Sequence, residues 1–243
     1  MKLTTIGCGD AFGSEGRYNT SFLLSDDQLN VLVDCGASTL LRLKQLNLSP
    51  ESIDVIVITH FHGDHYGGIP FLMISNKMEY QRTRPLKIIG PKGIEENVYG
   101  LQDALYPGTS KLFNEMNVSF HEYADELQEF HEFVEVKGLP VSHSPGSIPH
   151  GVQVRIKDKL FGFSGDTEWN DHLLELSKGT DLFVIECNNL NEDSPGHLSY
   201  KTIKQRQNDF QTKRLLLTHM GSEVIKAKNL EIDRLYDGLK IEF

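Results

Sequence analysis

Short apolar runs that end in polar residues recur along the whole chain. Runs of about four to eight apolar residues bounded by turn residues are typical of strands. They predict strands at 2–6, 20–24, 29–34, 54–58, 86–90, 117–123, 131–136, 152–157, 159–163, 181–185 and 213–218. Apolar positions at helical spacing predict helices at 38–47, 67–79, 93–105, 169–178 and 199–211. Turns at Asp26-Asp27 and Asp158-Lys159 join two strand pairs into hairpins. Strands thus alternate with single helices in two similar halves, which predicts an α/β fold.

A cluster of histidine and aspartate follows the predicted strand at 54–58. His60 and His62 are two residues apart, so they point the same way if the chain stays extended, and both can reach one metal ion. Asp64 and His65 come after a glycine, which lets the chain turn and aims this pair at a neighbouring position. Carboxylate beside imidazole, without cysteine, suits zinc and also tolerates manganese or iron. The segment therefore predicts ligands for two adjacent metal ions.

Three further polar residues lie in the same kind of place. His143, Asp166 and His219 each come just past a short apolar run, where a predicted strand meets its loop. Four ligands are too few for two ions, so the ends of other strands must supply the rest. These three residues are the candidates.

In chain order, HxHxDH, a lone histidine, SGDT and LTH resemble the metallo-β-lactamase superfamily of two-metal hydrolases. The resemblance implies a four-layer αββα sandwich and one hydrolase domain over residues 1–243. It also implies two divalent ions, zinc being the first expectation. The implied ligands are His60, His62 and His143 for one ion, Asp64, His65 and His219 for the other, and Asp166 as the bridge between them.

The opening of the chain is similar to that of ribonuclease Z and its phosphodiesterase relatives, in which GxG begins a loop and R-x-N-x-S follows. By this resemblance Arg17 and Asn19 touch a phosphate, although Arg17 could equally pin its own loop. Glu186 and His197 resemble the acid and the histidine of that branch. His150 follows a predicted ligand and could line the mouth of the pocket.

The expected chemistry is in-line hydrolysis of a phosphodiester. Two ions at about 3.5–4 Å would share and deprotonate a water. Asp64 and Asp166 are expected to take part in catalysis as well as in binding the ions, and Asp166 would orient the hydroxide. His197, held by Glu186, is the candidate donor of a proton to the leaving oxygen. The other interpretation makes His197 a surface residue next to the helix cap Ser199.

Length and composition agree with one compact domain. The chain has 243 residues and 39% apolar content, enough for a substantial core. No run approaches about 18 consecutive apolar residues, and the start lacks a signal peptide, so we expect a cytoplasmic, soluble protein that does not bind membranes. Cys8, Cys35 and Cys187 have neither metal nor redox spacing, which agrees with a reducing compartment.

The acidic balance limits the choice of substrate. A net charge of −10 and a pI near 5.4 disfavour general polyanion binding, because nucleic-acid affinity comes largely from Lys and Arg. Transfer-RNA-processing members of the resembled branch carry a long arm between the positions of His143 and Asp166. Two short predicted strands fill this interval here. We therefore expect a phosphodiesterase that acts on a small or cyclic phosphodiester, with an RNA 3′ end as the other substrate considered.

Three rival functions use related features. A carboxylic-ester, thioester or lactam hydrolase would need the same metals but not the pair of Glu186 and His197. A diiron protein of oxygen chemistry would usually carry a flavin-bearing partner domain, for which this chain has no room. A binding module without activity would be expected to lose ligands, and no predicted ligand position is missing here. The resemblance also suggests a homodimer.

Overall fold

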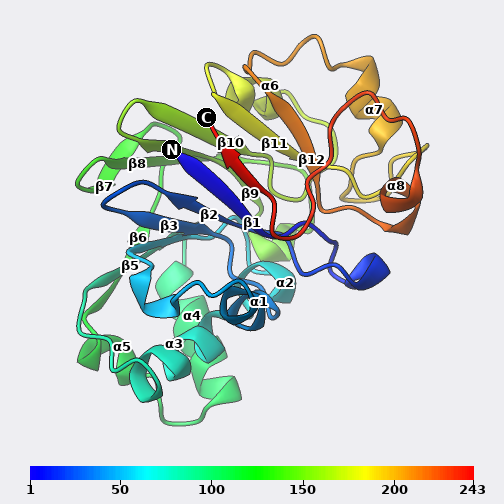
Figure 1. Cartoon of the computed structure of the whole chain (residues 1–243). Helices are drawn as coiled ribbons and strands as arrows, with labels where there is room; N and C mark the ends of the chain where they lie inside the picture. Colours follow the sequence, from blue (N-terminus) through cyan, green and yellow to red (C-terminus); the bar gives the residue numbers. More distant parts are fainter.

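Two β-sheets lie face to face in the computed structural model, which describes residues 1–243 (Figure 1). The first sheet has seven strands, in the order β13 (Lys240–Glu242), β1 (Lys2–Gly7), β2 (Ser21–Ser25), β3 (Asn30–Val33), β4 (Val55–Val57), β5 (Leu86–Gly90) and β6 (Val118–Glu122). The second has six, in the order β12 (Leu215–Thr218), β11 (Leu182–Glu186), β10 (Lys159–Phe163), β9 (His150–Ile156), β8 (Val134–Pro140) and β7 (Gln128–His131).

Helices cover the outer faces of both sheets. Those on the first sheet are α1 (Thr39–Gln45), α3 (Ile69–Met78), α4 (Ile94–Leu105) and α5 (Leu112–Glu115), and α6 (His172–Ser177) contacts β8, β9 and β10 of the second. The remaining helices are α2 (Gly63–Tyr66), α7 (Tyr200–Gln205) and α8 (Ser222–Lys226), with 3-10 turns at Ser14–Gly16, Pro50–Ser52 and Pro145–Ser147. Helix, sheet, sheet and helix form four layers, as expected. No helix combines the length and the apolar character that crossing a bilayer requires.

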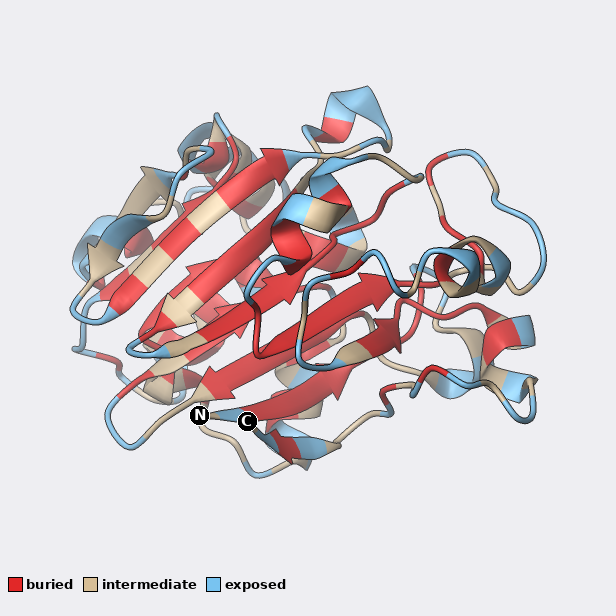
Figure 2. Ribbon diagram, turned by 90° about the horizontal axis from the view of Figure 1, so that it is seen from above, coloured by how far each residue is buried: buried red, intermediate tan, exposed pale blue.

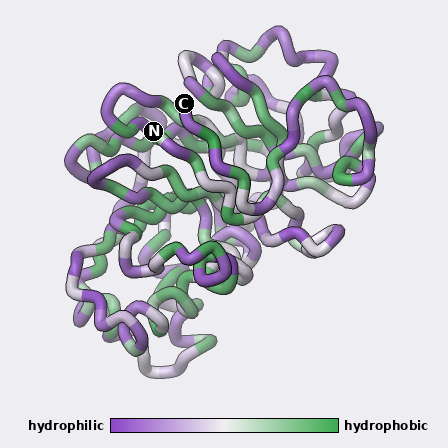
Figure 3. Tube along the Cα trace, viewed as in Figure 1, coloured by the Kyte–Doolittle hydropathy of each residue, from purple (hydrophilic) through white to green (hydrophobic).

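The first sheet is buried on both faces, as β4 shows. Val55 and Val57 belong to the cluster between the two sheets, whereas Ile56 and Ile58 pack with the helices outside. Side chains alternate between the faces of a strand, so an unbroken β-branched run suits a strand that is covered on both sides. The central strands are accordingly buried in Figure 2 and hydrophobic in Figure 3.

Parallel strands bring the polar strand ends together. β10, β11 and β12 are parallel neighbours, and so are β3, β4, β5 and β6. The carboxyl ends of parallel strands share one edge of a sheet, and this is where such sheets bind ligands. Glu186 therefore pairs in register with Thr218, the residue before His219.

Some predicted bounds were wrong. The predicted strand at 131–136 covers the end of β7, a turn and the start of β8, because Phe133 adopts φ 67°, a conformation that its side chain does not favour. The second hairpin turn lies at Lys157 and Asp158, one residue earlier than predicted. The helix predicted to reach residue 211 ends at Gln205. β13, α2, α5 and α8 are too short to show a period, and the sequence pattern missed them, as it missed the part of β7 before His131.

Candidate metal centre

The residues after β4 form the base of the site. His60 is buried in the segment after the strand, and His62 is the residue before α2. Asp64 and His65 lie on α2 itself, so one helical turn carries this pair toward the neighbouring position. The glycine before them has no left-handed φ; the turn is made by the helix and not by the glycine's special freedom, which corrects the expectation.

The structure brings all seven predicted ligands together in two groups. His60, His62 and His143 form one, and Asp64, His65, Asp166 and His219 form the other. Within each group the candidate ligand atoms lie within 4.8 Å of one another. His197 lies close to members of both, near His143 and Asp166 and near Glu186 and His219.

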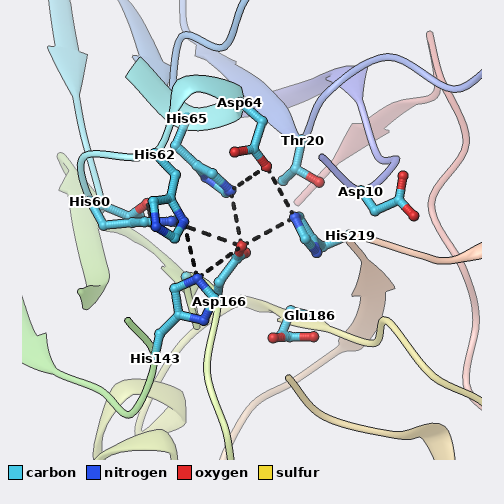
Figure 4. A network of polar contacts seen from close by, with 12 residues as sticks. Asp10, Thr20, His60, His62, Asp64, His65, His143, Asp166, Glu186 and His219 are labelled. Atoms are coloured by element: carbon cyan, nitrogen blue, oxygen red, sulfur yellow. Dashed lines mark hydrogen bonds and ion pairs between the residues drawn. The ribbon is translucent and has the colours of Figure 1, made fainter. Parts of the chain in front are cut away.

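Asp166 lies at the centre of both groups (Figure 4). Its Oδ2 is 3.2 Å from Nε2 of both His65 and His219, 3.9 Å from Nε2 of His60 and 4.0 Å from Nε2 of His143. Asp166 therefore has the position expected of a bridge.

Unpartnered buried atoms point into this centre. Nε2 of His60 and Oδ1 of Asp166 are buried and have no hydrogen-bond partner, and Nε2 of His65 faces only the carboxylate oxygens of Asp64 and Asp166, each 3.2 Å away. Buried polar atoms are nearly always satisfied, and a divalent cation would satisfy these three. Imidazole nitrogen and carboxylate oxygen are also a donor set that zinc accepts. The residues present therefore fit a metal centre.

The electrostatics favour the ligating forms of Asp166 and His60, whereas the carboxylates raise the pKa of His65 and raise that of His219 to about 9, so these two rings must release a proton when an ion binds. Burial alone would raise the pKa of Asp166, but the charges of His219 and His65 outweigh burial and hold that pKa well below its usual range. Burial, followed by the charge of His65, holds the pKa of His60 well below its usual range. Asp166 is thus an anion, and His60 is neutral with a free lone pair, as metal ligands must be.

Asp34 orients His65, and the sequence reasoning missed it. Oδ2 of Asp34 lies 2.7 Å from Nδ1 of His65, and both side chains are fully buried. Oδ1 of Asp34 accepts the backbone N–H of Thr59 at 2.8 Å. A carboxylate behind a histidine fixes the ring so that the other nitrogen faces the metal. Asp34 directly follows β3, so the rule that selected Asp166 and His219 also applies to it.

A loop from the second sheet orients His143. Its Nδ1 lies 2.8 Å from the carbonyl oxygen of Gly196, and the N–H of Gly196 donates to Glu168 at 2.8 Å. The sequence reasoning missed both partners. The only feature of the sequence that could have indicated them is that Glu168 lies close to Asp166 along the chain, and Gly196 close to His197.

Glu186 and His197 form the predicted pair. Nδ1 of His197 lies 2.9 Å from Oε1 of the fully buried Glu186. The imidazole ring lies next to those of His143 and His219, with centroids 4.9 and 5.4 Å apart. Burial lowers the pKa of His197, but the hydrogen bond and charge of Glu186 outweigh it, so the net shift is upward. Ser199 is the helix cap, as expected: its Oγ accepts the N–H of Thr202.

The predicted substrate contacts have different surroundings. The side-chain oxygen of Asn19 accepts hydrogen bonds from Ser38, and its nitrogen donates to the carbonyl of Asp10, so Asn19 joins two loops. The guanidinium of Arg17 has one weak contact, 4.0 Å from the sulfur of Cys8. Nδ1 of His150 lies 2.9 Å from the carbonyl oxygen of Ile148, and His150 belongs to neither ligand group.

The chain matches a known family and known proteins. The family described as Anti-Pycsar protein Apyc1 matches residues 1–233. Ribonuclease Z of Clostridium acetobutylicum is 32% identical over 162 residues, which are 66% of this chain and 52% of that protein. The chain thus spans about half the length of this relative. Ribonuclease Z of Methanothermobacter thermautotrophicus is 26% identical over 91% of this chain and 87% of that protein.

Two solved structures share the fold over almost their whole length. Human tRNase Z, short form, has a TM-score of 0.78 at 23% identity and covers 100% of this chain and 99% of its own. The metallo-beta-lactamase fold protein YhfI of Bacillus subtilis has a TM-score of 0.77 at 21% identity and covers 99% of both chains. This likeness confirms the four-layer sandwich.

Proposed function

We propose that this chain, which belongs to the family described as Anti-Pycsar protein Apyc1 and to the ribonuclease-Z-like branch of the metallo-β-lactamase superfamily, is a metal-dependent phosphodiesterase. The observation that carries the proposal is the placement of His197. Its ring lies beside those of His143 and His219, one from each candidate ligand group, and Glu186 holds it there. The alkoxide that leaves a phosphodiester needs a proton, which His197 held by Glu186 can donate, whereas the thiolate of a thioester leaves without one.

The candidate ligands would hold two divalent ions, zinc first among them. Seven side chains divide into two sets joined by a shared carboxylate: His60, His62 and His143; Asp64, His65 and His219; and Asp166 between them. Such ions supply a hydroxide near neutral pH and neutralise the oxygens of the phosphodiester. The protein's part is to fix the rings: Asp34 fixes His65, and the carbonyl of Gly196 fixes His143.

His197 would deliver the proton to the leaving oxygen. Its Nδ1 is occupied by Glu186, so Nε2 is the atom that would face the substrate. The carboxylate of Glu186 also accepts the backbone N–H groups of Thr167 and Asn188, which keeps it in place behind the imidazole. The hydrogen bond and the charge of Glu186 shift the pKa of His197 upward, which favours the protonated form that a general acid requires.

A small or cyclic phosphodiester is the substrate that we propose. The interval from His143 to Asp166 contains one 3-10 turn and the hairpin of β9 and β10, and no arm for gripping RNA. The net charge of −10 also opposes a long polyanion. The names of the relatives, ribonuclease Z and tRNase Z, support phosphodiester cleavage and make an RNA 3′ end the other candidate.

A parallel assay tests the reaction class. Purified, metal-analysed protein is given bis(p-nitrophenyl) phosphate, a chromogenic lactam and a thioester, and Asp166→Ala serves as the background control. We expect cleavage of the diester that depends on Asp166. Preferential cleavage of the lactam or the thioester would contradict the proposal.

A second assay tests the substrate size. A short cyclic diester is compared with a precursor tRNA at physiological salt. We expect the cyclic diester to be cleaved and the tRNA to be cut poorly. Efficient 3′ processing of the tRNA would overturn the size limit and leave the reaction class intact.

A further inference from the structure

One carboxylate near the end of the chain joins both ends of an early loop. Oδ1 of Asp237 accepts the backbone N–H of Cys8 at 3.1 Å, and Oδ2 accepts the backbone N–H of Tyr18, also at 3.1 Å. The N–H of Gly9 donates to the carbonyl of Tyr18 at 2.9 Å and closes the loop between them. We call this segment the 8–18 loop. A single side chain therefore fixes the geometry of both of its stems.

The 8–18 loop in turn holds the backbone next to His219. The carbonyl of Cys8 accepts the N–H of Met220 at 3.2 Å, and Gly9 forms a parallel bridge with Met220. His219 has φ 49°, a left-handed conformation that is uncommon for a residue with a side chain. The contacts of Met220 with Cys8 and Gly9 hold the backbone directly after this residue.

A second contact ties the same loop to α8, just beyond His219. Oε1 of Glu15 accepts the hydroxyl of Ser222 at 2.6 Å and lies 2.6 Å from the ammonium of Lys226. The 8–18 loop therefore touches the chain on the far side of His219 as well. This second contact lies at the surface, whereas the contact through Cys8 is buried.

The thiol of Cys8 adds a third bond to Asp237. Its Sγ lies 3.3 Å from Oδ1, within reach for a donated S–H. Burial, and then the negative charge of Asp237, raise the pKa of this thiol, so the sulfur remains a donor. Asp237 lies beyond residues 1–233, the part of the chain that the family matches.

We propose that Asp237 is a positioning residue of the metal centre, which sets the backbone of His219 through Cys8 and Met220. The inference rests on the proposed function insofar as His219 binds a metal ion. Removal of the carboxylate takes one hydrogen bond from each stem of the 8–18 loop, and the loosened backbone of Cys8 should hold the N–H of Met220 less firmly. The ring of His219 then loses its fixed direction toward Asp64 and Asp166.

The test compares Asp237→Ala and Asp237→Asn with Asp233→Ala. Asp233 lies in the same segment, but its side chain is 74% exposed and reaches only Arg214. Each protein is titrated with cobalt(II) as a spectroscopic probe, and the hydrogen exchange of the Met220 amide and the melting temperature are measured. Both variants of Asp237 should bind the more weakly held cobalt about tenfold less tightly, the scale of orienting groups around metal ligands. Their cobalt spectra should change and the Met220 amide should exchange faster, while Asp233→Ala should match the wild type.

Two outcomes separate this inference from the proposed function. Unchanged cobalt affinity, spectrum and Met220 exchange in both variants of Asp237 would overturn the positioning role. A wild type that binds no cobalt would contradict the proposed function, and faster Met220 exchange in the variants would still support the link from Asp237 to the His219 backbone. If Asp237→Ala does not fold, the isosteric Asp237→Asn decides the matter, because it keeps the volume and loses one of the two acceptors.

Discussion

The imidazole of His143 and the carbonyl of Gly196 lie 2.8 Å apart, which fixes the hydrogen on Nδ1 of the ring. Nε2 is then left as a lone pair on the side of His62 and Asp166. Gly196 can come this close only because it lacks a side chain. A Cβ there would lie 2.5 Å from Nδ1 of His143, and its φ of 81° also favours glycine.

Gly196→Ala should therefore damage the metal centre without touching a ligand. The new methyl group displaces His143, and we expect metal affinity to fall about tenfold to a hundredfold. Metal content after dialysis against a chelator series measures this. Gly146→Ala is the matched control, because a Cβ at Gly146 meets nothing within 4 Å. Equal affinities for the two variants would show that His143 does not depend on this contact.

Asp166→Ala should remove the bridge between the two groups. Asp166 faces four imidazoles, so its loss leaves them without their shared anion and lowers occupancy at both positions together. Elemental analysis and activity on a diester are the measurements, and the exposed Asp171→Ala is the control. One ion or fewer in fully loaded wild type would contradict the two-metal centre.

His197→Ala should keep both ions and the fold but lose about 10²–10⁴ in turnover, the scale of general acid catalysis. The loss should shrink for a p-nitrophenolate leaving group, which departs without a proton. Turnover on diesters with good and poor leaving groups, together with metal content, measures both effects. The exposed His172→Ala is the control. A lost metal ion, or full activity on an alkoxide leaving group, would assign His197 a different role.

Glu186→Gln should shift the pH profile of turnover. A general acid works in its protonated form, so the rate falls as pH rises through the pKa of His197. Burial lowers that pKa and Glu186 raises it, with a net rise. Without the carboxylate the pKa drops, and the falling limb should move to lower pH, with a smaller loss of rate than in His197→Ala. A falling limb at the same pH in both proteins would mean that another group controls it.

The site residues that could be predicted from the sequence were recognisable for one physical reason. Strands buried on both faces appear as unbroken apolar runs, so the polar residue after each run is visible, as it is for Asp166 and His219. Asp34 follows the same rule and could have been found by it. Gly196 could not, since its role depends on the loop after β11 meeting His143, which follows β8. Such a contact leaves no period in the sequence.

Residues that position the candidate ligands from a distance are the ones that sequence patterns predict least well. Asp237 is separated from Cys8 by almost the whole chain, and no local pattern links them. Phe133 and His219 have left-handed backbones although neither is a glycine, so their conformations come from tertiary contacts and not from local preference. The contact of the Asn19 side chain with Ser38 likewise has no local pattern in the sequence, and its contact with substrate stays a prediction.

The candidate ligands are divided between the two sheets. His60, His62, Asp64 and His65 follow β4 of the first sheet, whereas His143, Asp166 and His219 follow strands of the second. A bound ion would therefore link the two sheets, and its binding free energy would add to the free energy of unfolding. At a metal concentration about a thousand times Kd this amounts to about 4 kcal/mol for each ion. Metal supply would then govern not only turnover but also how long the protein survives heat and proteases.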